Sequence, residues 1–142
     1  MASTALGVAE SALDHALKYA RGKEQMGKPL TKQQGIRSEL ANMAVDVEAA
    51  RLLVYRAAWM YDRGLRNRKE TAMAKYYATE MAKRITKEVL RLHGLDGFIR
   101  KHQAAIFFSD APVFTIADGT SEIQLENISR ELGLLESGGM GS

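Results

Sequence analysis

The stretch from Ile116 to Gln124 brings together the side chains that are best placed to do chemistry. A carboxylate, Asp118, is followed by a glycine and two hydroxyl residues, directly ahead of an apolar-periodic segment. Ser121 and Gln124, three positions apart, form a capping-box pattern, which predicts that a helix begins here. The free N–H groups of a helix start suit an anionic or phosphate-bearing partner. We therefore expect Asp118 on a loop facing a cleft, although the pattern alone also fits a mere helix cap.

The three histidines do not fall at metal-ligand spacing with one another or with a pair of carboxylates. We interpret His15 as a solvent-facing helix residue and His93 as a favourable cation at a helix end. His102 has no partner in sequence either, so no metal site is predicted. The chain also lacks the Glu-x-x-His motif of di-iron bundles, a phosphate-cradling P-loop and a Ser-His-Asp arrangement.

The composition and charge of the chain limit the kinds of site and partner that it can have. With 142 residues, of which 46% are hydrophobic and 26% charged, the chain fits a single globular domain. It has no cysteine, so disulfides and thiolate metal sites are excluded. The net charge of +3 comes from basic residues that are interleaved with acids, and no apolar run approaches the length of a membrane span. We expect no nucleic-acid or membrane partner.

The elements that must position Asp118 are helical. Two prolines and long runs of good helix formers predict an all-α protein. Apolar residues recur at helical spacing in four segments, which are predicted to be helices: Thr4–Arg21, Lys32–Arg63, Lys69–His93 and Thr120–Leu135. The short apolar segment Ala104–Ala111 is predicted to form two further helical turns. Short turns between them predict an up-down four-helix bundle with a short extra helix, forming one domain over residues 1–142. The segments without helical periodicity, Arg21–Leu30 and Gly94–Gly119, are where we expect the chemistry.

The second helix is the longest, on the order of 45 Å for roughly 30 residues. Trp59 lies near its apolar stripe and is interpreted as a core residue. The stripe itself consists of Ile36, Leu40, Met43, Ala44, Val47, Ala50, Val54, Ala57, Ala58 and Tyr61.

Four groups of motifs, in order along nearly the whole chain, resemble the C-terminal helical domain of the acyl-CoA dehydrogenase family. They are Ala12–Asp14 with Tyr19–Ala20, Gln25–Leu30 and Gln34; Leu40–Ala44 with Ala49–Trp59; Ala72–Lys75 with His93–Gly94; and Asp110–Ala111 with Asp118–Gln124. The last motif is close to the family's Glu-Gly-Thr-Ser-x-Ile-Gln. Because the family has three domains, the chain is expected to be a fragment of a larger flavoenzyme, inactive and binding flavin weakly or not at all by itself.

The resemblance implies an FAD enzyme that removes two hydrogens from an acyl-CoA thioester. Asp118 corresponds to the catalytic base, and its backbone N–H to a donor that polarises the thioester carbonyl. Gly119 and Arg130 correspond to substrate-binding positions. The resemblance further implies an electron-transfer flavoprotein as acceptor, and the cytoplasm, or the mitochondrial matrix in a eukaryote, as the location.

The resemblance also implies a homo-oligomer, a dimer or tetramer, in which one subunit reaches the FAD of another. The corresponding cofactor-binding residues of this chain are Lys23, Gln25, Met26, Gln34, Arg91, Gly94 and Thr120.

Several residues depart from the family pattern. Asp118 replaces a glutamate and is one methylene shorter, and a shift of about 1 Å in a catalytic group can cost on the order of a hundredfold in rate. Lys23 replaces an arginine, which keeps the charge but loses the bidentate fork. Met26, Arg91, Ser109 and Ala117 also differ from the usual residues. Two alternatives follow: a relative similar to a flavin monooxygenase or nitroalkane oxidase, and a non-catalytic assembly subunit that completes a partner's FAD site.

Overall fold

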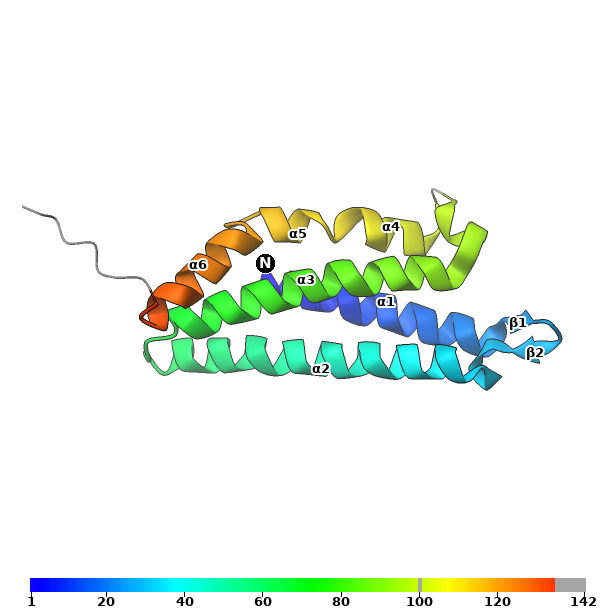
Figure 1. The fold of residues 1–142 in the computed structure, drawn as a ribbon, viewed down its shortest axis with the longest axis horizontal. Coiled ribbons are helices and arrows are strands. Elements are labelled where there is room, and N and C mark those ends of the chain that lie inside the picture. Colours follow the sequence, from blue (N-terminus) through cyan, green and yellow to red (C-terminus); the bar gives the residue numbers. More distant parts are fainter. Residues whose placement is uncertain (100, 135–142) are drawn as a thin grey trace, which may run out of the picture.

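The computed structural model describes residues 1–99 and 101–134. In this part of the chain there are six α-helices (Figure 1): α1 (Ala2–Gly22), α2 (Gln34–Asp62), α3 (Arg68–His93), α4 (Gln103–Asp110), α5 (Val113–Ile116) and α6 (Ser121–Glu131). Strands β1 (Glu24–Gln25) and β2 (Lys28–Pro29) form an antiparallel hairpin, and 3-10 turns span Leu30–Lys32 and Gly94–Phe98. The predicted all-α class is confirmed.

The three long helices run up, down and up, and the fourth position of the bundle is shared by α4, α5 and α6 (Figure 1). The predicted short helix and last helix are present as α4 and α6, and the four-residue helix α5 between them was not predicted. Pro112, which lacks a backbone N–H, separates α4 from α5. The left-handed backbone at Asp118 and Gly119 then separates α5 from α6.

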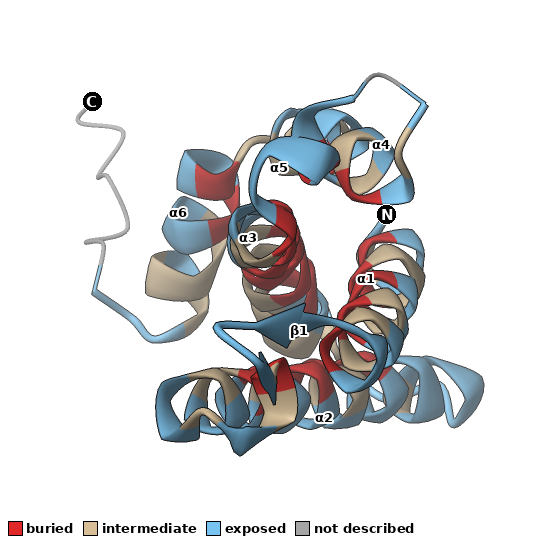
Figure 2. Cartoon of the chain, turned by 90° about the vertical axis from the view of Figure 1, so that its right-hand side faces the viewer, coloured by how far each residue is buried: buried red, intermediate tan, exposed pale blue. Residues whose placement is uncertain are grey.

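Helix α3 is the central element, since it packs against α1, α2, α4, α5 and α6. Figure 2 shows buried positions on α1, α2 and α3 turned toward one another. The face of α1 toward α3 is mostly alanine, from Ala5 to Ala20, which allows a close approach of the two helices. The largest fully buried side chains, Met81, Ile85 and Val89, come from α3. The core is therefore built around this helix.

The ends of two predicted helices are corrected. The last helix ends at Glu131, because the turn after it places Gly133 at φ +72°, a left-handed conformation that stops a helix. Leu135, the predicted end, lies outside the described residues. The predicted loop after the first helix contains the β1–β2 hairpin, whose two-residue turn has positive φ at Met26 and Gly27. The second helix consequently starts at Gln34.

The prediction of which α2 residues belong to the core is also corrected. Trp59 is 54% exposed and Tyr61 76% exposed, so neither belongs to the core. Ala44 and Ala58 are exposed as well. The reason is that α2 packs mainly against α1, α3 and the 3-10 turn Leu30–Lys32, so one side of it is left without a packed helix in the part of the chain that the structure describes. No helix among the described residues is long and apolar enough to cross a membrane.

Candidate functional site

The turn between α5 and α6 presents the predicted base. Asp118 has φ +55° and Gly119 has φ +90°, so both lie in the left-handed region. Aspartate is one of the few residues other than glycine that visits this region readily. The side chain of Asp118 is exposed, as predicted for an acid facing a cleft.

Two side chains hold this turn in place. The ammonium of Lys75, on α3, donates to the Gly119 carbonyl at 2.5 Å. The amide of Gln124 donates to the carbonyls of Asp118, at 3.4 Å, and Gly119, at 3.3 Å. The φ of +90° favours glycine at position 119, and a Cβ there would also lie 2.8 Å from the Gln124 amide nitrogen and displace that side chain. The peptide that carries the acid is thus fixed from both sides.

The predicted capping box is wrong in its details. Thr120, one residue before Ser121, is the N-cap of α6, and its hydroxyl accepts from the backbone N–H of Ile123 at 3.5 Å. The Ser121 hydroxyl instead donates to the carboxylate of Glu80 on α3, at 2.6 Å. Burial raises the pKa of Glu80, but the bonds from Ser121 and Lys83 outweigh it and leave that pKa lowered. Tertiary partners have replaced the local capping partners.

Lys75 is a residue of the candidate site that the sequence analysis did not single out. It is only 6% exposed, and burial lowers its pKa, although the charges of Asp118 and Glu80 oppose that shift. Its spacing along the helix could have indicated its burial, because Lys75 falls on the same face of α3 as Ala72 and Ala82, and all three are buried. A lysine on a buried stripe needs a partner, and here the partner is the turn that carries Asp118.

Asp118 lines a cavity of about 470 Å³ together with Lys75 and Gln124. Its remaining wall consists of the first residues of α1, the end of α2, and Asn67, Thr71 and Ala74. A second hollow of about 430 Å³ contains Arg130 and shares Tyr61, Asn67, Thr71 and Gln124 with the first. The two predicted substrate-side residues, Asp118 and Arg130, therefore face adjoining hollows. The Arg130 guanidinium is paired with Glu126 at 3.1 Å.

A second predicted group gathers in a cleft of about 490 Å³ formed by the end of α1, the hairpin and the end of α3. Lys23, Gln25, Arg91 and Gly94 all line it. The cleft therefore collects four residues from three segments of the chain.

Both cations of this cleft have carboxylate partners. Lys23 lies 3.7 Å from Asp96. Arg91 bonds to Glu39 at 2.5 Å and to Glu88 at 2.6 Å, and these bonds raise its pKa. The positive charge offered to a ligand is thus largely balanced.

The other predicted cofactor residues do not line this cleft. Met26 lies at the tip of the hairpin and is 96% exposed. Gln34 is the first residue of α2. Thr120 is at the start of α6, with Asp118 rather than with Lys23. The predicted site residues thus fall into two groups.

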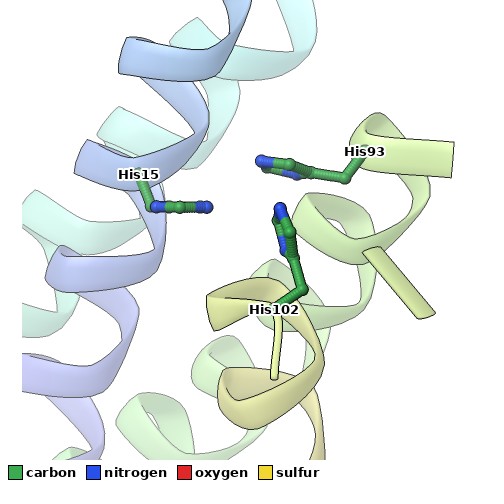
Figure 3. A group of neighbouring side chains, drawn as sticks. All are labelled: His15, His93 and His102. Carbon is green, nitrogen blue, oxygen red and sulfur yellow. The ribbon is translucent and has the colours of Figure 1, made fainter. Parts of the chain in front are cut away.

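The interpretation of the histidines is wrong. His93 is 2% exposed, and burial lowers its pKa, so it is not a cation at a helix end. His15 is half-buried rather than solvent-facing, and its Nε2 is fully buried. Both rings lie together with His102 in one cluster (Figure 3). This cluster was not predictable from spacing, because its members come from α1, α3 and the start of α4.

These observations define the class: an all-α domain that presents one fixed acidic turn in a cavity and a separate polar cleft. Comparisons with known proteins give the family. Residues 1–133 match the family described as "Acyl-CoA dehydrogenase, C-terminal domain". The chain belongs to the acyl-CoA dehydrogenase family, and the match is to the C-terminal domain of that family.

The most similar proteins agree with this assignment. A 3-(aryl)acrylate reductase of Clostridium sporogenes is 42% identical over 93% of this chain and 35% of its own length. The short-chain specific acyl-CoA dehydrogenase of Rattus norvegicus mitochondria is 44% identical over 87% of this chain and 30% of its own length. The structure of butyryl-CoA dehydrogenase from Megasphaera elsdenii has a TM-score of 0.91 and 39% identity, over 92% of this chain and 34% of that one. The chain thus spans about a third of the length of these relatives.

Proposed function

We propose that the chain is the C-terminal domain of an FAD-dependent oxidoreductase of three domains, and that Asp118 is the base that removes the α-proton of an acyl-CoA thioester. One observation carries the proposal. The family's acidic motif lies on a turn whose peptide is fixed by Lys75 and Gln124, with its exposed carboxylate at a cavity. A fixed base beside an open cavity is the arrangement that proton abstraction requires.

The surrounding residues have definite roles in this proposal. Lys75 holds the peptide that follows Asp118, through its bond to the Gly119 carbonyl, and so positions the carboxylate that accepts the proton. The N–H of Asp118 is the proposed donor to the thioester carbonyl, which makes the α-proton more acidic. Gly119 leaves the substrate room to approach the backbone, and Arg130 binds the substrate from the adjoining hollow.

FAD, when bound, supplies the acceptor for the hydrogen that leaves the β-carbon. The cleft at the end of α1 fits a part of such a dinucleotide, because it combines an ammonium and an amide, from Lys23 and Gln25, with the apolar side chains of Ile36 and Leu92. We assign Gly94 and Arg91 to the same contact, and we assign Met26 and Gln34, which do not line the cleft, to contacts with FAD outside it. Thr120, at the start of α6, would contact FAD near Asp118. Since these groups lie apart on the chain, we propose that the cleft serves the FAD of a neighbouring subunit.

The exposed face of α2 is the proposed surface for that neighbour. Val45, Leu52, Tyr55 and Trp59 recur at helical spacing and are each more than half exposed. Apolar stripes of this kind mark interaction surfaces. We propose that this face of α2 is covered by a second copy of the same protein, because such an assembly would bring one subunit's cleft to another subunit's cofactor.

The reverse reaction is a second candidate, favoured by the names of two relatives. One is the 3-(aryl)acrylate reductase, and another is a subunit of a caffeyl-CoA reductase–Etf complex of Acetobacterium woodii, 42% identical over 91% of this chain. In that direction the protonated Asp118 would deliver a proton to the α-carbon of an unsaturated substrate. An electron-transfer flavoprotein is the proposed electron partner in either direction.

The test uses the full-length parent protein with FAD, under anaerobic conditions and with a panel of acyl-CoA thioesters. We expect the visible flavin band to be lost in the wild type and to remain in Asp118→Asn. Asp62→Asn is the matched control, because Asp62 is the other carboxylate that lines the cavity.

The other results each have a meaning. Bleaching that survives in Asp118→Asn would move the base to another residue. No bleaching with any thioester would favour the oxygenase-like or assembly-subunit alternative. Re-oxidation by unsaturated aryl-acyl substrates, rather than bleaching by saturated ones, would favour the reductase.

A further inference from the structure

The three histidines of the chain converge although they come from different elements: His15 from α1, His93 from the end of α3 and His102 from the start of α4. Figure 3 shows the three rings pointing into a common space. One ring nitrogen of each lies within 4.8 Å of those of the other two. The centroid of the His93 ring is 4.9 Å from those of both His15 and His102.

The tautomer of His93 is set by its backbone contact. Its Nδ1 lies 2.7 Å from the carbonyl oxygen of Val89, which can only accept a hydrogen bond. In the neutral ring the proton is therefore on Nδ1, and Nε2 carries a free lone pair. Histidines that bind metals usually donate their other N–H to a carbonyl or carboxylate in this way.

Two ring nitrogens of the cluster are buried without a hydrogen-bond partner. Among the described residues, Nε2 of His15 and Nε2 of His93 are the buried side-chain atoms without a hydrogen-bond partner. Unsatisfied buried polar atoms are uncommon in proteins and call for an explanation such as a water or an ion. The surroundings keep these rings in place, since Tyr19 packs at 3.9 Å from His93 and Phe107 lies edge-on to His15.

His102 is engaged differently. As the N-cap of α4, its Nδ1 accepts from the N–H of Ala104 at 3.2 Å, which leaves its proton on Nε2. Ligation through Nε2 would require the proton to move to Nδ1 and the cap bond to open. His15 and His93 thus each offer a buried ring nitrogen that has no partner, whereas His102 has to open its cap bond before it can act as a third ligand.

We propose that His15, His93 and His102 form a binding site for a divalent first-row transition metal of the kind that prefers imidazole, with Zn²⁺ as the reference ion. Zn²⁺ binds imidazole nitrogen at about 2.0–2.1 Å in tetrahedral geometry, which places the nitrogens roughly 3.3 Å apart. The ring nitrogens would have to approach one another by about 1.5 Å at most, a movement that side-chain rotation can supply. Three neutral ligands leave the fourth position to water.

The chain suits a direct test, because these are its only three histidines and it has no cysteine. The 142-residue chain, with any affinity tag removed, is titrated with Zn²⁺ by calorimetry and with Co²⁺ by visible absorption. We expect one ion per chain and the absorption of tetrahedral Co²⁺. His15→Gln and His102→Gln should each weaken Zn²⁺ binding at least tenfold, since each removes one of three ligands.

Asp14→Asn is the matched control, because it removes an exposed carboxylate next to His15 and leaves the three rings intact. It should bind Zn²⁺ as the wild type does. Circular dichroism checks the fold of each variant. If His93→Gln does not fold, the two variants at the less buried positions still decide the outcome.

Two results would overturn the proposal. One is Zn²⁺ binding that is unchanged in both His15→Gln and His102→Gln, which would place the ion elsewhere. The other is Zn²⁺ binding by the wild-type chain that is no stronger than binding by a variant carrying both His15→Gln and His102→Gln. That result would make the cluster a water-bridged structural element.

Discussion

The ammonium of Lys75 donates a hydrogen bond of 2.5 Å to the carbonyl oxygen of Gly119, the residue after the proposed base. This bond joins the central helix α3 to the turn between α5 and α6. It explains why a lysine is buried among alanines on α3, and it links the position of Asp118 to the central helix of the fold.

We predict that Lys75→Met lowers the turnover of the full-length parent by on the order of a hundredfold, because a base displaced by about 1 Å loses that much. Steady-state kinetics on saturating acyl-CoA measure this. Lys87→Met is the control, since Lys87 is exposed on the same helix. Equal turnover of the two variants would mean that Lys75 does not position the base.

Gly119→Ala is predicted to destabilise the chain by about 1–3 kcal/mol, because φ +90° is unfavourable for alanine and the new Cβ would lie 2.8 Å from the Gln124 amide. Urea denaturation measures the difference. Gly7→Ala, within α1 and with nothing within 4 Å of its Cβ, should instead stabilise by up to about 1 kcal/mol. A neutral Gly119→Ala would show that the turn relaxes without cost.

The hydrogen bonds to Glu80 predict that the stability of the folded protein depends on pH. Its pKa is lowered from 4.5 in the folded state, so the folded protein binds this proton less readily than the unfolded chain. The stabilisation is therefore complete above about pH 4.5 and is lost as the pH falls through the folded-state pKa.

Glu80→Gln should accordingly lose about 1 kcal/mol of stability at pH 7, chiefly from the ion pair with Lys83, and the gap to the wild type should close on acidification. Denaturation curves between pH 3 and pH 7 provide the measurement. Glu24→Gln, at an exposed position of the hairpin, should stay within about 0.5 kcal/mol of wild type at pH 7. A gap of constant size at every pH would contradict the prediction.

The isolated chain is predicted to bind FAD weakly or not at all and to have no dehydrogenase activity. The cations of the cleft that is proposed to face FAD are paired with carboxylates, and Arg91 in particular is held by Glu39 and Glu88. Equilibrium dialysis with FAD measures binding. Tight binding of one FAD per chain would overturn this prediction and with it the proposed dependence on further domains.

The exposed apolar face of α2, formed by Val45, Leu52, Tyr55 and Trp59, is predicted to hold copies of the protein together. Leu52→Glu combined with Trp59→Glu should shift the full-length parent toward smaller species in sedimentation velocity, because two charges would enter an apolar contact. Glu48→Gln, on the same helix, is the control. An unchanged sedimentation coefficient in the double variant would exclude this face as the interface.

The sequence by itself determined the helices, because apolar spacing and good helix formers act locally. It also determined the acidic turn: an aspartate and a glycine tolerate the left-handed backbone that Asp118 and Gly119 adopt. The family motifs identified the C-terminal domain of the acyl-CoA dehydrogenases, which the comparisons confirm.

Only the tertiary structure decided which polar groups meet. Ser121 bonds to Glu80 rather than capping its own helix, and Lys75 reaches the turn before α6, because α3 lies beside both. Trp59 is exposed since α2 lacks a neighbour on one side. His15, His93 and His102 come together across 87 positions of sequence only when three elements pack. Local patterns cannot report such contacts, because their energy comes from partners that are distant in the chain.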